Sequence, residues 1–327
     1  MIPQTLKLKE QSAGVISAVS TAAALTSYWL TNEDNSGVLD FLAERPIHNV
    51  VMSGLIRDNG LESWLNRGTF YACHNEAGKL EGVALIGHAM FLDARTDDAL
   101  EVFARLAQDV RSTHMIMGEQ ETIQRFWNYY SAGGQAPRLS CREVLFEQTS
   151  SVETFAPVPD LRPANLDDLS LIAPVHAALA CEESGVNPLD ADPNGFRMRY
   201  ARRIRQERVW VWVEGGQLIF KADVVSDTPD AIYLEGIYVN PNERGKGYGS
   251  RCMSQLVRSL LKRTKAIVLF VNEEHQAAQS FFQGIGFTRH GLYETIFLRE
   301  QNQRVLTAKL CLGQFLIRGE KPCPENH

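Results

Sequence analysis

The stretch Arg244-Gly245-Lys246-Gly247-Tyr248-Gly249 decides the fold of this chain. It follows residues 232–239, an apolar β-branched run that predicts a strand, and it opens residues 248–263, whose apolar spacing predicts a helix. A glycine-rich turn between a strand and a helix exposes several backbone N–H groups where the helix begins. Such groups bind anions, and a turn of this kind suits a diphosphate.

The composition is that of an ordinary globular protein. With 327 residues the chain is long enough for about two domains, and 44% apolar and 22% charged residues are usual for soluble proteins. A net charge of −6 gives no reason to expect nucleic acid or an anionic membrane as a partner. The six cysteines are scattered, without a CxxC pair or metal-ligand spacing, which predicts reduced thiols in a cytoplasmic protein and no metal site.

Residues 13–30 form the one mildly apolar run near the start of the chain. Several serines and threonines make this run too polar for a membrane span. Two lysines before it and three alanines within it resemble a signal peptide only faintly. We expect instead an amphipathic helix after a short strand, at the start of a folded domain.

The second half of the chain follows a linker-like stretch at residues 149–159. Its short turns predict an antiparallel meander, and the helix after the glycine loop predicts a parallel crossover to the next strand. The expected elements are a strand at 160–163, helices at 166–183 and 195–206, strands at 208–213, 217–225 and 232–239, the helix at 248–263, a strand at 266–271, a helix at 274–283, and one or two strands at 288–298.

The first half shows a weak copy of the same order of elements, which suggests an internal duplication. We expect strands at 70–74 and 80–91, a helix at 97–110, a strand at 114–117, a helix at 121–130 and a strand at 142–146. Where the glycine loop should stand, residues 91–98 contain three aspartates and no glycine. Such a stretch repels a diphosphate, so we expect a cofactor only in the second half.

Two motifs in the second half resemble those of the GNAT superfamily of acyl-CoA N-acyltransferases. That family's loop, Arg/Gln-x-x-Gly-x-Gly/Ala, corresponds to Arg244, Gly247 and Gly249. A second family motif corresponds to residues 271–287, which end in Gly286-Phe287. The resemblance covers residues 160–298 and implies an α/β fold with a mixed sheet.

The whole chain also looks like two-domain GNAT proteins whose first half is a degenerate copy. Residues 45–50 and 182–188 are similar to stretches that recur in that group. The resemblance implies a degenerate GNAT-like domain without a cofactor loop at 1–150 and a catalytic GNAT domain at 158–299. A C-terminal extension of unknown role follows at 300–327, in which residues 306–317 are apolar enough to pack as an extra element.

Two other interpretations of the glycine loop are weaker. A dinucleotide site needs a third glycine where this chain has Ser250, and it needs a strand that opens a βαβ unit rather than one in a meander. Glu273 is the residue that such a site would use for the ribose. A plain glycine-rich turn does not account for the second motif.

The resemblance implies how an acyl-CoA is held. The pantetheine pairs with the backbone of the strand before the loop, and the diphosphate takes N–H groups of the loop, helped by the side chain of Arg244 or Lys246. The residues that we expect to contact acetyl-CoA are Ile237, Tyr238, Val239, Arg244, Gly245, Lys246, Gly247, Tyr248, Gly249, Ser250, Asn272, Phe281 and Phe282.

Transfer of an acyl group to an amine requires a base, and Glu235 is the first candidate. It lies on the strand before the loop, in a segment, 234–239, that resembles sequences in some aminoglycoside-type GNAT enzymes. A carboxylate on a half-buried strand suits this role, although a solvent-facing or ion-paired glutamate would give the same sequence.

Glu182 and Glu183 end the first helix of the second half, which in this fold borders the acceptor site. Two adjacent acids there suit a cationic amine as the acceptor. A solvated helix end is the plainer interpretation, but acids at a helix C-terminus oppose the helix dipole, which favours another purpose.

The proton donor is less well defined by the sequence. The family's usual Tyr corresponds to Phe282, which cannot donate a proton, and its usual Asn corresponds to His275. Tyr293 is the substitute that we expect, with Tyr238, His275 or water as alternatives, although a histidine at a helix start is more often structural. The missing Tyr keeps open a non-catalytic acyl-CoA-binding role.

The sequence therefore predicts a cytoplasmic N-acyltransferase that moves an acetyl group from acetyl-CoA to a primary amine by direct attack in a ternary complex. The expected acceptor is a small-molecule amine, and a protein amino group stays open. The alternative is a non-catalytic acyl-CoA-binding regulatory or scaffold protein. Neither nucleic acid nor a membrane is expected as a partner.

Overall fold

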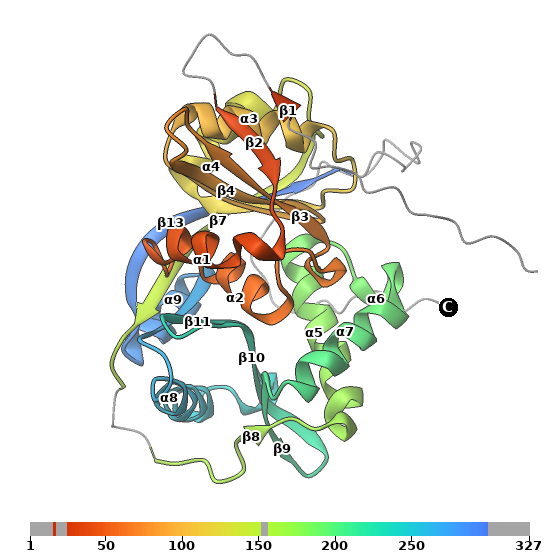
Figure 1. Ribbon diagram of the computed structural model, residues 1–327. Coiled ribbons are helices and arrows are strands. Elements are labelled where there is room, and N and C mark those ends of the chain that lie inside the picture. The colour runs from red at the N-terminus through yellow and green to blue at the C-terminus, as the bar shows by residue number, and fades with distance from the viewer. Residues whose placement is uncertain (1–15, 18–24, 152–155, 300–327) are drawn as a thin grey trace, which may run out of the picture.

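The computed structural model describes residues 16–17, 25–151 and 156–299. Within them, the strands of both halves join in one mixed sheet of the order β1-β2-β3-β4-β5-β6-β13-β7-β12-β11-β10-β9-β8 (Figure 1). No helix in these ranges is long and apolar enough to cross a membrane. The extension at 300–327, with its apolar run at 306–317, lies outside the described residues.

The first half repeats the predicted order of elements, with differences near the start. Residues 80–91 form two strands rather than one, and helices α1 and α2 were not predicted. The helix expected within 13–30 is wrong in the described part, because Thr26–Trp29 pairs with β3 as a strand. The elements are β1 (Ile16–Ser17), β2 (Thr26–Trp29), α1 (Asn35–Ala43), α2 (Val50–Asn59), η2 (Trp64–Asn66), β3 (Gly68–His74), β4 (Leu80–Gly87), β5 (Ala89–Ala94), α3 (Asp97–Gln108), β6 (Met115–Glu119), α4 (Gln120–Tyr130) and β7 (Pro137–Gln148).

The second half follows the predicted order closely. The antiparallel meander is confirmed, and so is the parallel pairing of β11 with β12 through the helix that follows the glycine loop. Residues 288–298 form a single strand, and a short helix, α6, was not predicted. The elements are β8 (Arg162–Pro163), α5 (Leu169–Ser184), α6 (Pro188–Ala191), α7 (Pro193–Arg205), β9 (Val209–Glu214), β10 (Gln217–Asp227), β11 (Ala231–Val239), α8 (Tyr248–Leu260), β12 (Ala266–Asn272), α9 (Gln276–Gly284) and β13 (Thr288–Leu298).

The last strand of each half pairs with the other half. Strand β13 lies between β6 and β7, and β7 lies between β13 and β12. Figure 1 shows β13, in blue, running from the second half into the first. The linker at 149–159 therefore does not separate two sheets, and the division of the chain into 1–150 and 158–299 stays a prediction.

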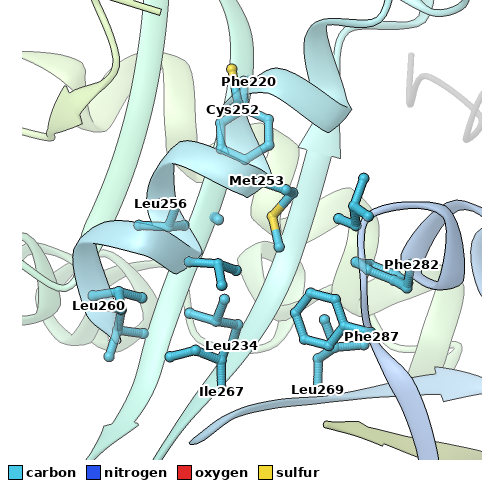
Figure 2. Packing of buried hydrophobic residues seen from close by; sticks show 14 of the residues in the cluster. Phe220, Leu234, Cys252, Met253, Leu256, Leu260, Ile267, Leu269, Phe282 and Phe287 are labelled. Carbon is cyan, nitrogen blue, oxygen red and sulfur yellow. The ribbon is translucent and has the colours of Figure 1, made fainter. Parts of the chain in front are cut away.

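Helices cover both faces of the sheet. On one face, α3 and α4 pack on the first half, and α8 and α9 pack on the second half; we call this the α8 face. Figure 2 shows α8 of that face, with Met253 and Leu256 directed toward Leu234 and Ile267 of the sheet. On the opposite face, which we call the α5 face, α1 and α2 cover the first half and α5 and α7 cover the second.

Candidate active site

Strands β11 and β12 part in the middle of the second half. They pair only where Ala231–Tyr233 meets Ala266–Val268, although β11 continues to Val239 and β12 continues to Asn272. On the same stretch β12 stays paired with β7. The backbone of β11 beyond Tyr233 therefore faces a gap in the ladder, where an extended ligand finds unpaired N–H and C=O groups.

A bulge bends β11 at this gap. Lys221 of β10 pairs with Tyr238, whereas Asp223 pairs with Glu235, so β11 has one more residue than β10 between these pairs. Gly236 supplies the extra length with φ +59°, a left-handed conformation that favours glycine. A Cβ atom there would lie 2.7 Å from Nζ of Lys221, so the position has no room for a larger side chain.

A buried polar network supports the bulge from the α5 face. Lys221, fully buried, donates through Nζ to the Gly236 carbonyl oxygen at 2.9 Å and to Oδ2 of Asp223 at 2.8 Å. The hydroxyl of Tyr200 donates to the Asp223 carboxylate at 2.6 Å, and Nδ1 of His176 lies 3.4 Å from Oδ2 of Asp223. The backbone at the gap is therefore fixed by side chains of β10, α5 and α7.

The glycine loop lies between β11 and α8, as predicted. Gly245 and Gly247 have φ values of +76° and +78°, and no other atom lies within 4 Å of a Cβ built on either. The first turn of α8 begins with Arg251 donating to the Gly247 carbonyl at 3.2 Å, so the N–H groups ahead of it point out of the helix start. This arrangement has the space and the donors that an anion needs.

Gly249 lets the start of α8 approach the sheet. A Cβ atom there would lie 3.1 Å from Val239 and 3.3 Å from Phe281, which is tighter than ordinary contact. The two cations of the loop already have partners. Nε of Arg244 donates to the Val239 carbonyl at 3.2 Å, and Nζ of Lys246 donates to Glu243 at 2.8 Å. Both side chains are exposed and would have to exchange these partners to bind a ligand.

Three carboxylates gather on the α5 face beside the gap. Glu235 comes from β11, Glu183 from the end of α5, and Glu143 from β7 of the first half. The charges of Glu235 and Glu143 both act on Glu183, and all three act on the phenol of Tyr233. The Tyr233 hydroxyl lies 3.4 Å from Oε2 of Glu235. These carboxylates bring together acids from both halves.

Burial and mutual repulsion raise the pKa values of Glu183 and Glu143. The pKa of Glu183 is raised to about 8, first by the surrounding protein and then by Glu235 and Glu143. Its side chain is nevertheless exposed to solvent, as that of Glu182 is. Burial also raises the pKa of Glu143, and Glu235 adds to this, although the Thr295 hydroxyl, which donates to Glu143 at 2.6 Å, opposes it. Glu182 is exposed.

The structure does not bring Tyr293 to Glu235. Its hydroxyl lies 2.7 Å from Nδ1 of His48, and its ring packs on Phe270 at 4.6 Å. Burial raises its pKa, and the charges that act on it are those of Glu119, Arg45 and Asp93 in the first half. These residues line a cavity of about 30 Å³, and Tyr293 also lies opposite Glu143 in the pairing of β13 with β7.

The remaining predicted residues divide into two groups. Ile237, Tyr238 and Val239 lie half-buried along the gap, and Asn272 ends β12 at an open cavity of about 530 Å³. Phe282, by contrast, is buried in the core against Phe146, Phe281 and Phe287, so its side chain packs the core. The exposed His275 stands at the start of α9.

Sequence reasoning missed Tyr233 and Glu143. The alternation of a strand places Tyr233 on the same face as Glu235, so the sequence did contain a signal for it. Glu143 carried none, because it reaches the site only through the pairing of β7 with β12, where it lies opposite Asn272.

The comparisons agree with this geometry. Residues 176–287 match the family described as the Acetyltransferase (GNAT) family. No curated protein matches the chain. Among solved structures, a Drosophila protein has 14% sequence identity and a TM-score of 0.60, with 84% of this chain and 99% of that chain covered.

Two further structures carry GNAT descriptions. A tandem GNAT protein from the clavulanic acid biosynthesis pathway has 13% identity and a TM-score of 0.51, with 83% of this chain and 98% of that chain covered. An acetyltransferase of the GNAT family from Colwellia psychrerythraea has 11% identity and a TM-score of 0.50, with 84% and 99% covered. At these identities the likeness concerns the fold alone.

The chain thus has a tandem GNAT-like fold, and its second half contains a domain of the GNAT acetyltransferase family.

Proposed function

We propose that this protein is a cytoplasmic N-acetyltransferase that moves an acetyl group from acetyl-CoA to a primary amine of a small molecule. The observation that supports this most is the gap between β11 and β12. It has the glycine loop of α8 at one end and the carboxylates of Glu143, Glu183 and Glu235 on the α5 face. A diphosphate site and an amine site therefore meet along one strand.

The residues around the gap fit an acyl-CoA. The N–H groups from Gly245 to Ser250 would hold the diphosphate, and the backbone of residues 237–239 would pair with the pantetheine. When bound, acetyl-CoA supplies a thioester-activated acetyl group. The bulge at Gly236 fixes the direction of the backbone N–H groups beside it, so they are preorganised to polarise a carbonyl oxygen.

The chain's own side chains prepare the acceptor. The ionised fractions of Glu143 and Glu183 attract an ammonium group to the gap, and this attraction grows as the pH rises past the pKa of Glu183, about 8. Glu235 takes the proton that the ammonium must lose before its nitrogen can attack. Tyr233, within 3.4 Å of Glu235, is the hydroxyl nearest to this proton. We assign it, in place of Tyr293, to hydrogen bonding at the site.

Gly247→Asp tests the cofactor site by isothermal calorimetry with coenzyme A. We expect binding at least about 100-fold weaker, because a carboxylate at the helix start repels the diphosphate and replaces a left-handed glycine. Gly78→Asp is the matched control, since Gly78 has φ +75° and equally open surroundings in the turn between β3 and β4. Equal coenzyme A affinity in Gly247→Asp and the parent would remove the loop from the site.

A second candidate function is acyl-CoA binding without turnover. The observation in its favour is the burial of Phe282 in the core, at the position where the family resemblance places a proton donor. A panel of primary amines, assayed for thiol release from acetyl-CoA, separates the two. Release with any amine supports the transferase, whereas coenzyme A binding without release across the panel supports the binding protein.

The pKa of Glu183, about 8, predicts how acceptor binding depends on pH. Below pH 8 this carboxyl is mostly protonated, and above it the carboxylate adds a negative charge beside the ammonium. The KM of the acetylated amine should therefore fall about fivefold or more between pH 7 and 9, beyond any change from the amine's own ionisation. Glu183→Gln should lose this extra fall, and Glu182→Gln should keep it. An identical KM profile in Glu183→Gln and the parent would contradict the assignment.

A further inference from the structure

A groove of about 900 Å³ runs between the two halves, away from the glycine loop. One wall comes from α2 and η2 of the first half and the other from α7 of the second half. Its lining includes Leu55, Trp64, Arg67, Met198, Arg199 and Arg202. The volume lies in the range of pockets that bind small organic molecules.

Two arginines in this groove share one nearby acid, so their positive charges are not fully balanced. Arg67 and Arg199 lie close enough for their charges to interact, and among the described residues Asp192 is the acid whose charge acts on Arg67. Asp192 is already engaged, because its carboxylate accepts from the Gly195 N–H at 2.9 Å and pairs with Arg199 at 3.0 Å. Burial first, and then the charge of Arg199, lower the pKa of Arg67.

The other polar side chains of the groove do not balance this excess of positive charge, because neighbouring arginines already engage them. Arg208 forms a two-pronged ion pair with Asp58, and Arg202 donates to the side-chain oxygen of Asn59 at 2.8 Å. The same positive field reaches His88, whose pKa is lowered to about 4, first by burial and then by Arg67. The groove is therefore positive in a protein whose net charge is −6.

The backbone of Arg67 is also unusual. Its φ of +53° is left-handed, a conformation in which glycine is the least strained residue. Arg67 ends the short helix η2 in this conformation, and its carbonyl oxygen lies so close to Gly87 that a Cβ atom on Gly87 would be 2.3 Å away. An arginine at a position that suits glycine indicates a role for its side chain.

The apolar part of the groove is open to solvent. The side chains of Trp64 and Met198 are 82% and 70% exposed, although large apolar residues are usually buried. Leu55 and Leu65 lie half-buried beneath them. An exposed tryptophan beside two arginines that share one acid suits a ligand with an apolar body and a negative end.

We propose that this groove binds a small organic anion that carries a carboxylate or a phosphate on an aromatic or aliphatic body. Arg67 and Arg199 hold the negative group with the paired N–H groups of their guanidinium forks. Trp64 and Met198 cover the apolar body. The site is independent of the proposed acetyl transfer, and its ligand contacts both halves of the chain.

Binding is tested by the fluorescence of Trp64, with phenyl phosphate, benzoate and inorganic phosphate as probes. We expect a saturable change with phenyl phosphate or benzoate, whichever negative group the site prefers. Inorganic phosphate should bind at least about tenfold more weakly than the preferred aromatic probe, because it leaves the apolar wall uncovered. Trp64→Phe should lose the signal.

Arg67→Gly and Arg199→Gln should each weaken binding of the preferred probe about tenfold or more. Arg67→Gly suits the left-handed backbone, so the fold should be kept, and circular dichroism checks this. Arg105→Gln, an exposed arginine on α3 outside the groove, is the matched control and should bind as the parent does.

Three results would overturn the proposal. These are no saturable signal with either aromatic probe, unchanged affinity in Arg67→Gly and Arg199→Gln, or equal affinity for inorganic phosphate and the aromatic probes. Saturating coenzyme A should leave the affinity unchanged, and displacement of the probe by coenzyme A would overturn the independence of the site.

Discussion

Asp223→Ala is expected to lower the free energy of unfolding by about 3–5 kcal/mol. Asp223 and Lys221 are both fully buried and 2.8 Å apart. Burial alone would raise the pKa of Asp223, but the charge of Lys221 and its cationic neighbours holds it below its ordinary value. Without the carboxylate, the ammonium of Lys221 loses its counter-ion and the hydroxyl of Tyr200 loses its acceptor in the interior.

Urea denaturation measures this loss of stability, and two control variants test whether it comes from the burial of the ion pair. Asp230→Ala breaks an exposed pair with Lys265 and should change the free energy of unfolding by less than about 1 kcal/mol. Lys221→Met combined with Asp223→Leu removes this ion pair and should recover part of the stability, because a buried ion pair contributes little net free energy. The recovery is incomplete because Arg203, 3.5 Å from Asp223, also loses its carboxylate partner. A loss below about 1 kcal/mol in Asp223→Ala would show that the pair is not desolvated as its burial implies.

The same network links stability to the proposed chemistry. Lys221 donates to the Gly236 carbonyl at 2.9 Å, so the bulge of β11 depends on a fully buried side chain. The double variant leaves this carbonyl without its ammonium donor. If the network positions the bulge, the recovered double variant should still turn over more slowly than the parent.

Much of the second half could be predicted from the sequence because its signals are local. The glycine loop, the apolar face of α8 and the alternation of β9 lie within short windows, and the structure confirms the elements there. Glu235 was predicted from the same window, because it lies on the strand before the loop in a segment that resembles some aminoglycoside-type GNAT enzymes, and its role as the base stays a prediction.

The rest depended on contacts between residues far apart in the sequence. Helix α2 contains Gly54 in its middle, which weakens a helix prediction; a Cβ there would lie 1.9 Å from the side chain of Ser226. Glu143 enters the site only because β7 and β13 exchange partners between the halves. Tyr293 is drawn to His48 for the same reason. No periodicity in one segment encodes such pairings.

Glu235→Gln is expected to lower kcat/KM for the acetylated amine by about 10²–10⁴-fold. Glutamine keeps the size of the side chain and an oxygen for the Tyr233 hydroxyl, but it cannot take a proton from the ammonium. The loss should appear mainly in kcat, because Glu143 and Glu183 still attract the amine. Steady-state kinetics at saturating acetyl-CoA measure both parameters.

A variant of a neighbouring carboxylate tests whether the loss of kcat is specific to Glu235. Glu183→Gln should act mainly on KM, since Glu183 attracts the ammonium, and calorimetry should show parental coenzyme A affinity in both variants. If Glu235→Gln keeps kcat within about threefold of the parent, well short of the 10² expected for a base, Glu235 is not the base. If the large loss of kcat appears in Glu183→Gln instead, the end of α5, not β11, carries the base, and the gap serves only to hold acetyl-CoA.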